Sequence, residues 1–174
     1  MSAAPLEPAR ILSLLKRPVR YVPYGVQRAI LQPLLNFVFR DKLASGDLDF
    51  LDGRALHIVI KDLGLRWALD ARSGRLQMVD RNAPFDTCIS GNVLEFLLLA
   101  SREEDPDSLF FQRRLLIEGD TALGLELKNL MDSLEWERIP LPLRHALRAA
   151  LALETYAARA SETSKNHMGL GGPL

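Results

Sequence analysis

The clearest pattern in the chain is an alternation of apolar and polar side chains in its middle third. Residues 63–70 read Leu-Gly-Leu-Arg-Trp-Ala-Leu-Asp, with an apolar side chain at every odd position. This period of two predicts a half-buried β-strand, and similar runs predict strands at 56–60, 75–79 and 85–90. Because only short turns separate these runs, we expect the four strands to pair antiparallel as a meander.

Helical spacing flanks this strand region. Residues 27–45 place apolar side chains three and four positions apart, which predicts a helix that Pro33 either starts or kinks. A fifth short strand is predicted at 115–117. Further helical patterns lie at 93–101, 108–112, 121–133 and 142–160. The order of elements predicts an α+β fold, with a mostly antiparallel five-stranded sheet and helices packed on one face.

The chain divides into four parts by pattern. Residues 1–26 form a basic, amphipathic and proline-punctuated segment, and residues 27–137 carry the sheet and the helices around it. Residues 138–160 are expected to form an amphipathic C-terminal helix. Residues 161–174 contain Gly, Ser and Thr, so we expect them to be a flexible tail.

Charge narrows the possible partners. The 174 residues hold 22 basic and 22 acidic side chains, and this balance argues against a dedicated nucleic-acid-binding protein. The first part is nevertheless basic, and no acid lies between residues 8 and 28. We expect its cations to contact an anionic membrane surface. These cations are Arg10, Lys16, Arg17 and Arg20.

Motifs for catalysis are not found in the sequence. Its three histidines are scattered, and Cys88 is the single cysteine, so neither a metal site nor a disulfide within the chain is expected. The sequence has no nucleophile elbow, phosphate loop or dinucleotide fingerprint. We therefore expect a protein without cofactor that is not an enzyme.

Two charged pairs are the remaining candidates for chemistry. Glu118 and Asp120 could form a paired-carboxylate site. The stronger interpretation is that Glu118 faces solvent on the strand and that Asp120 caps the following helix. Arg113 and Arg114 could hold a phosphate or carboxylate headgroup, and solvated charge beside the sheet is again the stronger interpretation.

The second half of the chain resembles a known family. Residues 87–100, Thr-Cys-Ile-Ser-Gly-Asn-Val-Leu-Glu-Phe-Leu-Leu-Leu-Ala, and the strand–Gly-Asp–helix ending around Gly119 and Asp120 are similar to the sterol-carrier-protein (type 2) domain family. Phe-Phe-Gln-Arg-Arg at 110–114 and Asn-Leu-Met-Asp at 129–132 resemble a bacterial branch of that family, the accessory factors of oxygen-independent ubiquinone biosynthesis.

This resemblance implies a function as well as a fold. It implies helices that enclose an apolar lipid pocket, which would hold a polyprenylated ubiquinone precursor or a phospholipid. The implied protein partners are the peptidase-like, iron–sulfur hydroxylation proteins of anaerobic ubiquinone biosynthesis. We expect a cytoplasmic protein with peripheral membrane association, and whether it forms a homodimer is open.

Alternation along the strands and helical spacing suggest which side chains would contact the lipid. The expected contacts are Leu56, Ile58, Leu65, Trp67, Leu69, Phe96, Phe110, Phe111, Leu115, Ile117, Leu127 and Met131. The alternative is a closed core filled by these side chains, in a protein-interaction scaffold without lipid cargo.

Overall fold

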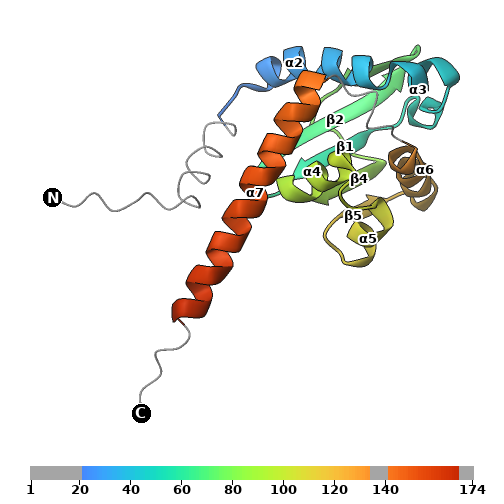
Figure 1. The fold of residues 1–174 in the computed structure, drawn as a ribbon. Coiled ribbons are helices and arrows are strands. Elements are labelled where there is room, and N and C mark those ends of the chain that lie inside the picture. The colour runs from blue at the N-terminus through green and yellow to red at the C-terminus, as the bar shows by residue number, and fades with distance from the viewer. Residues whose placement is uncertain (1–20, 134–140, 169–174) are drawn as a thin grey trace.

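The computed structural model describes residues 21–133 and 141–168, shown in Figure 1. The elements are α2 (Tyr24–Val38), α3 (Arg40–Ser45), the 3-10 turn η1 (Asp49–Leu51), β1 (Leu56–Ile60), β2 (Leu65–Arg72), β3 (Arg75–Met78), β4 (Thr87–Gly91), α4 (Val93–Ser101), α5 (Pro106–Phe111), β5 (Leu116–Gly119), α6 (Thr121–Asp132) and α7 (Leu141–Met168). The predicted α+β class and the five-stranded, mostly antiparallel sheet are confirmed.

The sheet is not the simple meander that the sequence predicts. Its strand order is β3-β2-β1-β4-β5, so β4 pairs with β1 and not with β3. The β1–β4 pair is parallel, with Leu56 opposite Thr87, and the other three pairs are antiparallel. The chain after β3 returns to the start of β1, where the Asp86 amide donates to the Ala55 carbonyl at 2.9 Å and the Ala55 amide donates to Asp86 Oδ2 at 2.7 Å.

Several element boundaries differ from the predicted ones for local reasons. β2 begins at Leu65 because Gly64, with φ of 63°, closes a turn by donating its amide to the Lys61 carbonyl. Pro33 lies inside α2 and does not start it. β5 covers Leu116–Gly119, one residue later than predicted, and α7 continues through Met168.

The core lies between one face of the sheet and the helix α6. Apolar side chains of α6 recur at the spacing of one helical face and pack against the strands. The buried core residues are Leu48, Leu51, Leu56, Ala71, Leu76, Ile89, Leu109, Leu115, Leu127, Leu130 and Met131. Asp120 caps α6 as predicted, because its Oδ1 accepts from the Ala122 and Leu123 amides at 2.8 and 3.0 Å.

Helix α2 covers the edge of the sheet at β3 through side-chain hydrogen bonds. The Asn36 side chain makes two hydrogen bonds with the Leu76 backbone, as the backbone of a neighbouring strand would. Its Oδ1 accepts from the Leu76 amide at 3.0 Å, and its Nδ2 donates to the Leu76 carbonyl at 2.7 Å. The Met78 amide donates to Gln32 Oε1 at 3.2 Å. These amide side chains satisfy backbone groups that an edge strand would otherwise leave unpaired.

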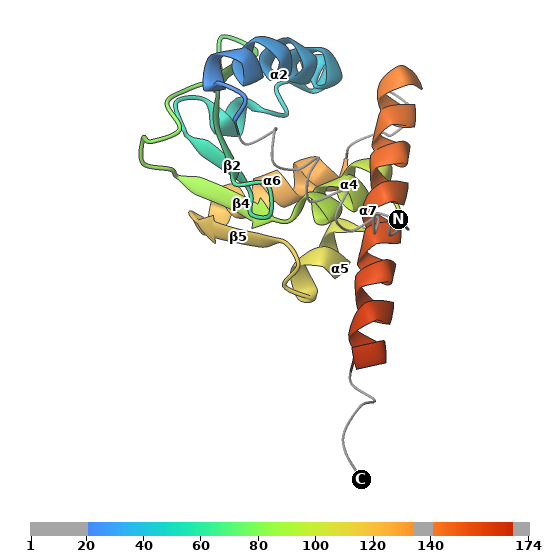
Figure 2. The same cartoon turned by 90° about the vertical axis from the view of Figure 1, so that its left-hand side faces the viewer.

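Helix α7 packs beside α4 and extends past the other described elements in both views (Figures 1 and 2). Leu151 is the buried residue of this helix among the side chains that the structure describes, whereas Leu153 and Tyr156 are exposed. The packing of α7 on the domain is therefore restricted to one side of the helix.

Candidate functional site

The predicted lipid contacts on the strands lie in register on one face of the sheet. Ile58 lies opposite Trp67 on β2 and opposite Ile89 on β4, and Ile89 lies opposite Ile117 on β5. These four side chains form a continuous apolar row across four strands, which we call the central row. Leu56 and Leu69 form a second pair on the same face, next to the row.

The helices bring most of the remaining predicted contacts to the same face. Leu115, Leu127 and Met131 belong to the buried core, and Phe96 and Phe110 pack against it. Phe111 does not take part, because its side chain is 93% exposed at the end of α5. Ile89 was not among the predicted contacts, although the alternation of residues 87–91 could have identified it.

Close backbone approaches show that protein side chains fill this space. A Cβ on Gly91 would lie 2.6 Å from Leu115 Cδ2, and one on Gly124 would lie 2.8 Å from Ile117 Cγ2. Glycine thus lets β4 and α6 approach the apolar side chains closely. A lipid tail could enter only if a helix moved away from the central row.

A small hollow lies where side chains of the apolar interior reach the surface. Its volume is about 200 Å³, and it lies between the C-terminal ends of α4 and α6. Leu99 and Met131 line its inner side, and both belong to or pack against the core. Arg102 and Asp132 line its rim.

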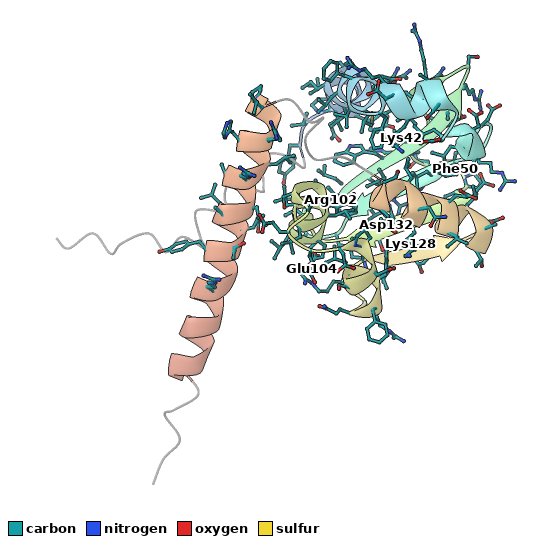
Figure 3. All side chains as sticks on the ribbon, turned by 45° about the vertical axis from the view of Figure 1, so that its right-hand side comes forward. Lys42, Phe50, Arg102, Glu104, Lys128 and Asp132 are labelled. Atoms are coloured by element: carbon teal, nitrogen blue, oxygen red, sulfur yellow. The ribbon has the colours of Figure 1, made fainter. Side chains whose placement is uncertain are left out.

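Polar contacts connect the helices around this hollow. Arg102 donates to the Asp132 carbonyl, and Lys128 Nζ lies 2.7 Å from Asp107 Oδ1 and 3.7 Å from Asp132 Oδ2. Figure 3 shows Arg102, Lys128 and Asp132 gathered where α6 meets the segment after α4. Because these side chains are partly exposed, the contacts are weak and can open at small cost.

Arg114 is not a free headgroup ligand. Its Nη1 lies 2.7 Å from Glu104 Oε2, and its Nε lies 3.6 Å from Glu95 Oε1. Glu95 is buried and also accepts from the Asn92 amide at 2.9 Å, which caps α4. The guanidinium is therefore neutralised by two carboxylates, in agreement with a structural role.

The opposite face of the sheet holds buried polar groups without signs of reactivity. Burial, and then the charge of Glu118, raises the pKa of the Cys88 thiol, so the thiol stays protonated and is a poor nucleophile. His57 is 1% exposed and lies against Phe85, with ring centroids 5.4 Å apart. No cluster of three potential metal ligands is found within residues 21–133 and 141–168.

His57 should make the stability of the fold depend on pH. Burial, and secondarily the charge of Arg66, lowers the pKa of His57 below its ordinary value of 6.5. As the pH falls, His57 therefore binds a proton more readily in the unfolded chain than in the folded one. The free energy of unfolding should then fall as pH drops below about 6.5.

The measurement is urea unfolding of the wild type and of His57→Phe between about pH 7 and pH 5, a range in which few carboxylates titrate. We expect a smaller loss of stability in the variant, which has no proton to bind at this position. Equal losses in the two proteins would contradict this role of His57.

The predicted membrane-surface cations Arg10, Lys16, Arg17 and Arg20 lie outside the described residues. None of the helices in the described part of the chain is both long and apolar enough to cross a bilayer.

Comparisons with known proteins agree on one family. Residues 34–132 match the SCP-2 sterol transfer family. The ubiquinone biosynthesis accessory factor UbiT of Escherichia coli K12 is 43% identical over 158 residues, which cover 90% of each chain. Its counterpart from Escherichia coli O157:H7 gives the same values. A solved structure, the UbiJ-SCP2 ubiquinone synthesis protein, aligns with a TM-score of 0.53 and 19% identity over 65% of this chain and 100% of that one.

Proposed function

Because this chain belongs to the SCP-2 sterol transfer family and to its UbiT group of ubiquinone biosynthesis accessory factors, we propose that it is a non-catalytic lipid-binding protein of oxygen-independent ubiquinone biosynthesis. It binds a polyprenylated precursor or a phospholipid above the central row. It then presents this lipid to the peptidase-like, iron–sulfur hydroxylation proteins. The observation that carries this proposal is the apolar row itself, which runs across four strands and has α6 over its β4 and β5 end.

The energetics of such binding are favourable. Each buried methylene contributes about 0.8 kcal/mol, so a tail that buries about ten of them contributes about 8 kcal/mol. The polar contacts around the hollow at Met131 contribute at most about 1 kcal/mol each. Burial of a lipid tail can therefore offset the cost of separating α6 from the end of α4, as long as the tail keeps water from the displaced apolar side chains.

The chemistry of the domain supports a carrier more than a catalyst. Cys88 is held as a protonated thiol, and Arg114 and Asp120 are engaged in ion pairing and capping. Membrane contact through Arg10, Lys16, Arg17 and Arg20 would bring the carrier to its lipid source.

The test is to identify the lipid cargo directly. Protein purified without detergent is examined by native mass spectrometry, and its lipids are then extracted and identified. We expect a stoichiometric quinone precursor or phospholipid. Met131→Trp, which places a large side chain at the hollow, should reduce lipid uptake from vesicles by about tenfold, an effect of about 1.4 kcal/mol.

Leu125→Trp is the matched control, because Leu125 lies on the same helix but is 57% exposed. It should take up lipid like the wild type. A wild-type protein that is empty and also takes up no lipid would instead favour the closed protein-interaction scaffold.

A further inference from the structure

The side of helix α2 that faces the protein carries Leu35, which packs against the core, and several polar side chains that hydrogen-bond to the sheet. Trp67 donates its indole N–H to Gln27 Oε1 at 2.7 Å, and Tyr24 donates its hydroxyl to the Val79 carbonyl at 2.7 Å. Together with the contacts of Gln32 and Asn36 at β3, these hydrogen bonds fix the rotation of the helix about its axis. No residue of α2 is buried, although all fifteen are described.

The outward side of α2 is apolar. Val26, Ile30 and Phe37 are 47%, 61% and 51% exposed, and Pro33 is exposed between them. Their positions follow one another at intervals of four, three and four residues, so they lie in one line along the helix. We call these four residues the α2 stripe. It is a contiguous apolar surface, and such a surface usually marks an interaction site.

The charges around the α2 stripe are mostly positive. Helix α2 contains no acid, and its one basic residue, Arg28, lies toward the sheet, where its Nε donates to Gln32 Oε1 at 3.2 Å. The Arg40 guanidinium lies 5.6 Å from the Phe37 ring centroid, and an open hollow of about 940 Å³ beside this end of the helix is lined by Phe37, Arg40 and Arg75. Asp41 pairs with Arg40 at 3.4 Å, and at the other end of the helix Asp80 lies near Tyr24 together with Arg81.

This combination fits one kind of partner. A second copy of the chain would set the arginines of one copy against those of the other, which disfavours self-association. Nucleic acid would leave the apolar line in contact with phosphates. A helix that lies flat, with an apolar line and a basic margin, is the form that binds the interface of an anionic bilayer.

We propose that α2 is the surface on which the described domain docks to an anionic lipid bilayer. The α2 stripe lies at the boundary between headgroups and acyl chains, and Arg40 and Arg75 face the phosphates. This inference deepens the proposed function, on which it rests for its biological purpose, and it adds a contact in the folded domain to the cations of residues 1–26. Figure 1 shows α2 running along the top of the molecule, above β2.

The test is co-sedimentation with vesicles. The vesicles are phosphatidylcholine alone, or phosphatidylcholine with about one-third phosphatidylglycerol. The wild type should bind the anionic vesicles, and Ile30→Glu/Phe37→Glu should bind them at least about tenfold more weakly. Leu125→Glu is the matched control, because its exposure is similar but it lies on α6, and it should bind like the wild type. Circular dichroism and thermal unfolding show whether each variant is folded.

Several outcomes would overturn the proposal. The first is a wild type that does not bind anionic vesicles, and the second is an Ile30→Glu/Phe37→Glu variant that binds them like the wild type. The third is a loss of binding in Leu125→Glu as large as the loss in the double variant. Val26→Glu/Ile30→Glu provides a second test should the first variant misfold. Unchanged binding in both α2 variants, with binding lost in Lys16→Glu/Arg17→Glu/Arg20→Glu, would assign docking to the N-terminal segment alone and the α2 stripe to a protein partner.

Native mass spectrometry of the same variants separates this inference from the proposed function. Loss of vesicle binding with cargo retained supports docking through α2. An empty wild type that takes up no lipid but still binds vesicles through α2 would reject the carrier function and leave the docking surface standing.

Discussion

Replacing Gly119 with alanine should lower the free energy of unfolding by about 3 kcal/mol or more. Gly119 ends β5 with φ of 104°, a conformation that side chains rarely adopt. A Cβ there would lie 2.3 Å from the Asp86 carbonyl oxygen and 3.1 Å from the Thr87 Cα. Both atoms belong to the backbone, so neither can turn away as a flexible side chain could.

The surroundings of Gly119 make relaxation costly. The Asp86 carbonyl also accepts from the Asp120 amide at 2.8 Å, and Asp86 fixes the start of β4 through Ala55. Moving this carbonyl would therefore disturb the β1–β4 pair and the start of α6 together. The measurement is urea unfolding followed by circular dichroism.

Gly53→Ala is the control for this prediction. Gly53 also has a positive φ, 69°, but a Cβ on it would meet nothing within 4 Å. Gly53→Ala should lower the free energy of unfolding by about 1–2 kcal/mol, from backbone strain alone. Similar losses in the two variants would show that the contact with Asp86 does not decide the effect.

Asn36→Ala should cost about 2–4 kcal/mol, because it removes both partners of the Leu76 backbone at the sheet edge. The alanine itself favours the helix, so the loss comes from the backbone N–H and C=O that remain under α2 without a partner. Urea unfolding measures the loss.

Asn129→Ala tests whether the effect belongs to the sheet edge. Asn129 also lies inside a helix, but its side chain is exposed. Its replacement should change stability by about 0.5 kcal/mol or less. The prediction for Asn36 fails if the two variants lose equal stability.

Local patterns predicted the elements better than their arrangement. The alternation around Trp67 and the helical spacing of 121–133 identified β2 and α6 because each depends on which side of one segment is buried. The parallel pairing of β4 with β1 depends on contacts between distant segments. The short connection between β3 and β4 suggested that these two strands form a hairpin, and no local pattern in the sequence indicated otherwise.

The orientation of α2 shows a second limit of sequence patterns. The apolar spacing of residues 27–45 predicted a helix but did not distinguish Ile30, which lies in the α2 stripe, from Leu35, which packs against the core. Gln32 and Asn36 look like surface residues in the sequence. Their role appears only when the open edge of β3 lies beside them.

The candidate site was predicted in part for similar reasons. Alternation placed Ile58, Trp67 and Ile117 on one face, as the register confirms. Phe111 was predicted as a lipid contact together with Phe110, but adjacent residues on a helix point in different directions, and Phe111 faces solvent. Whether these side chains contact a lipid stays a prediction for the cargo experiment.

The parallel β1–β4 pair has a consequence for how the chain folds. Short turns join β1, β2 and β3, so these strands can pair as successive hairpins with little loss of chain entropy. β4 can join β1 only after residues 61–86 have closed a loop, and β5 and α6 follow it. Closure of that loop is thus the expected rate-limiting step. Refolding should slow when the two hydrogen bonds between Ala55 and Asp86 are weakened. Mutations in α6, which packs after that step, should mainly change the unfolding rate.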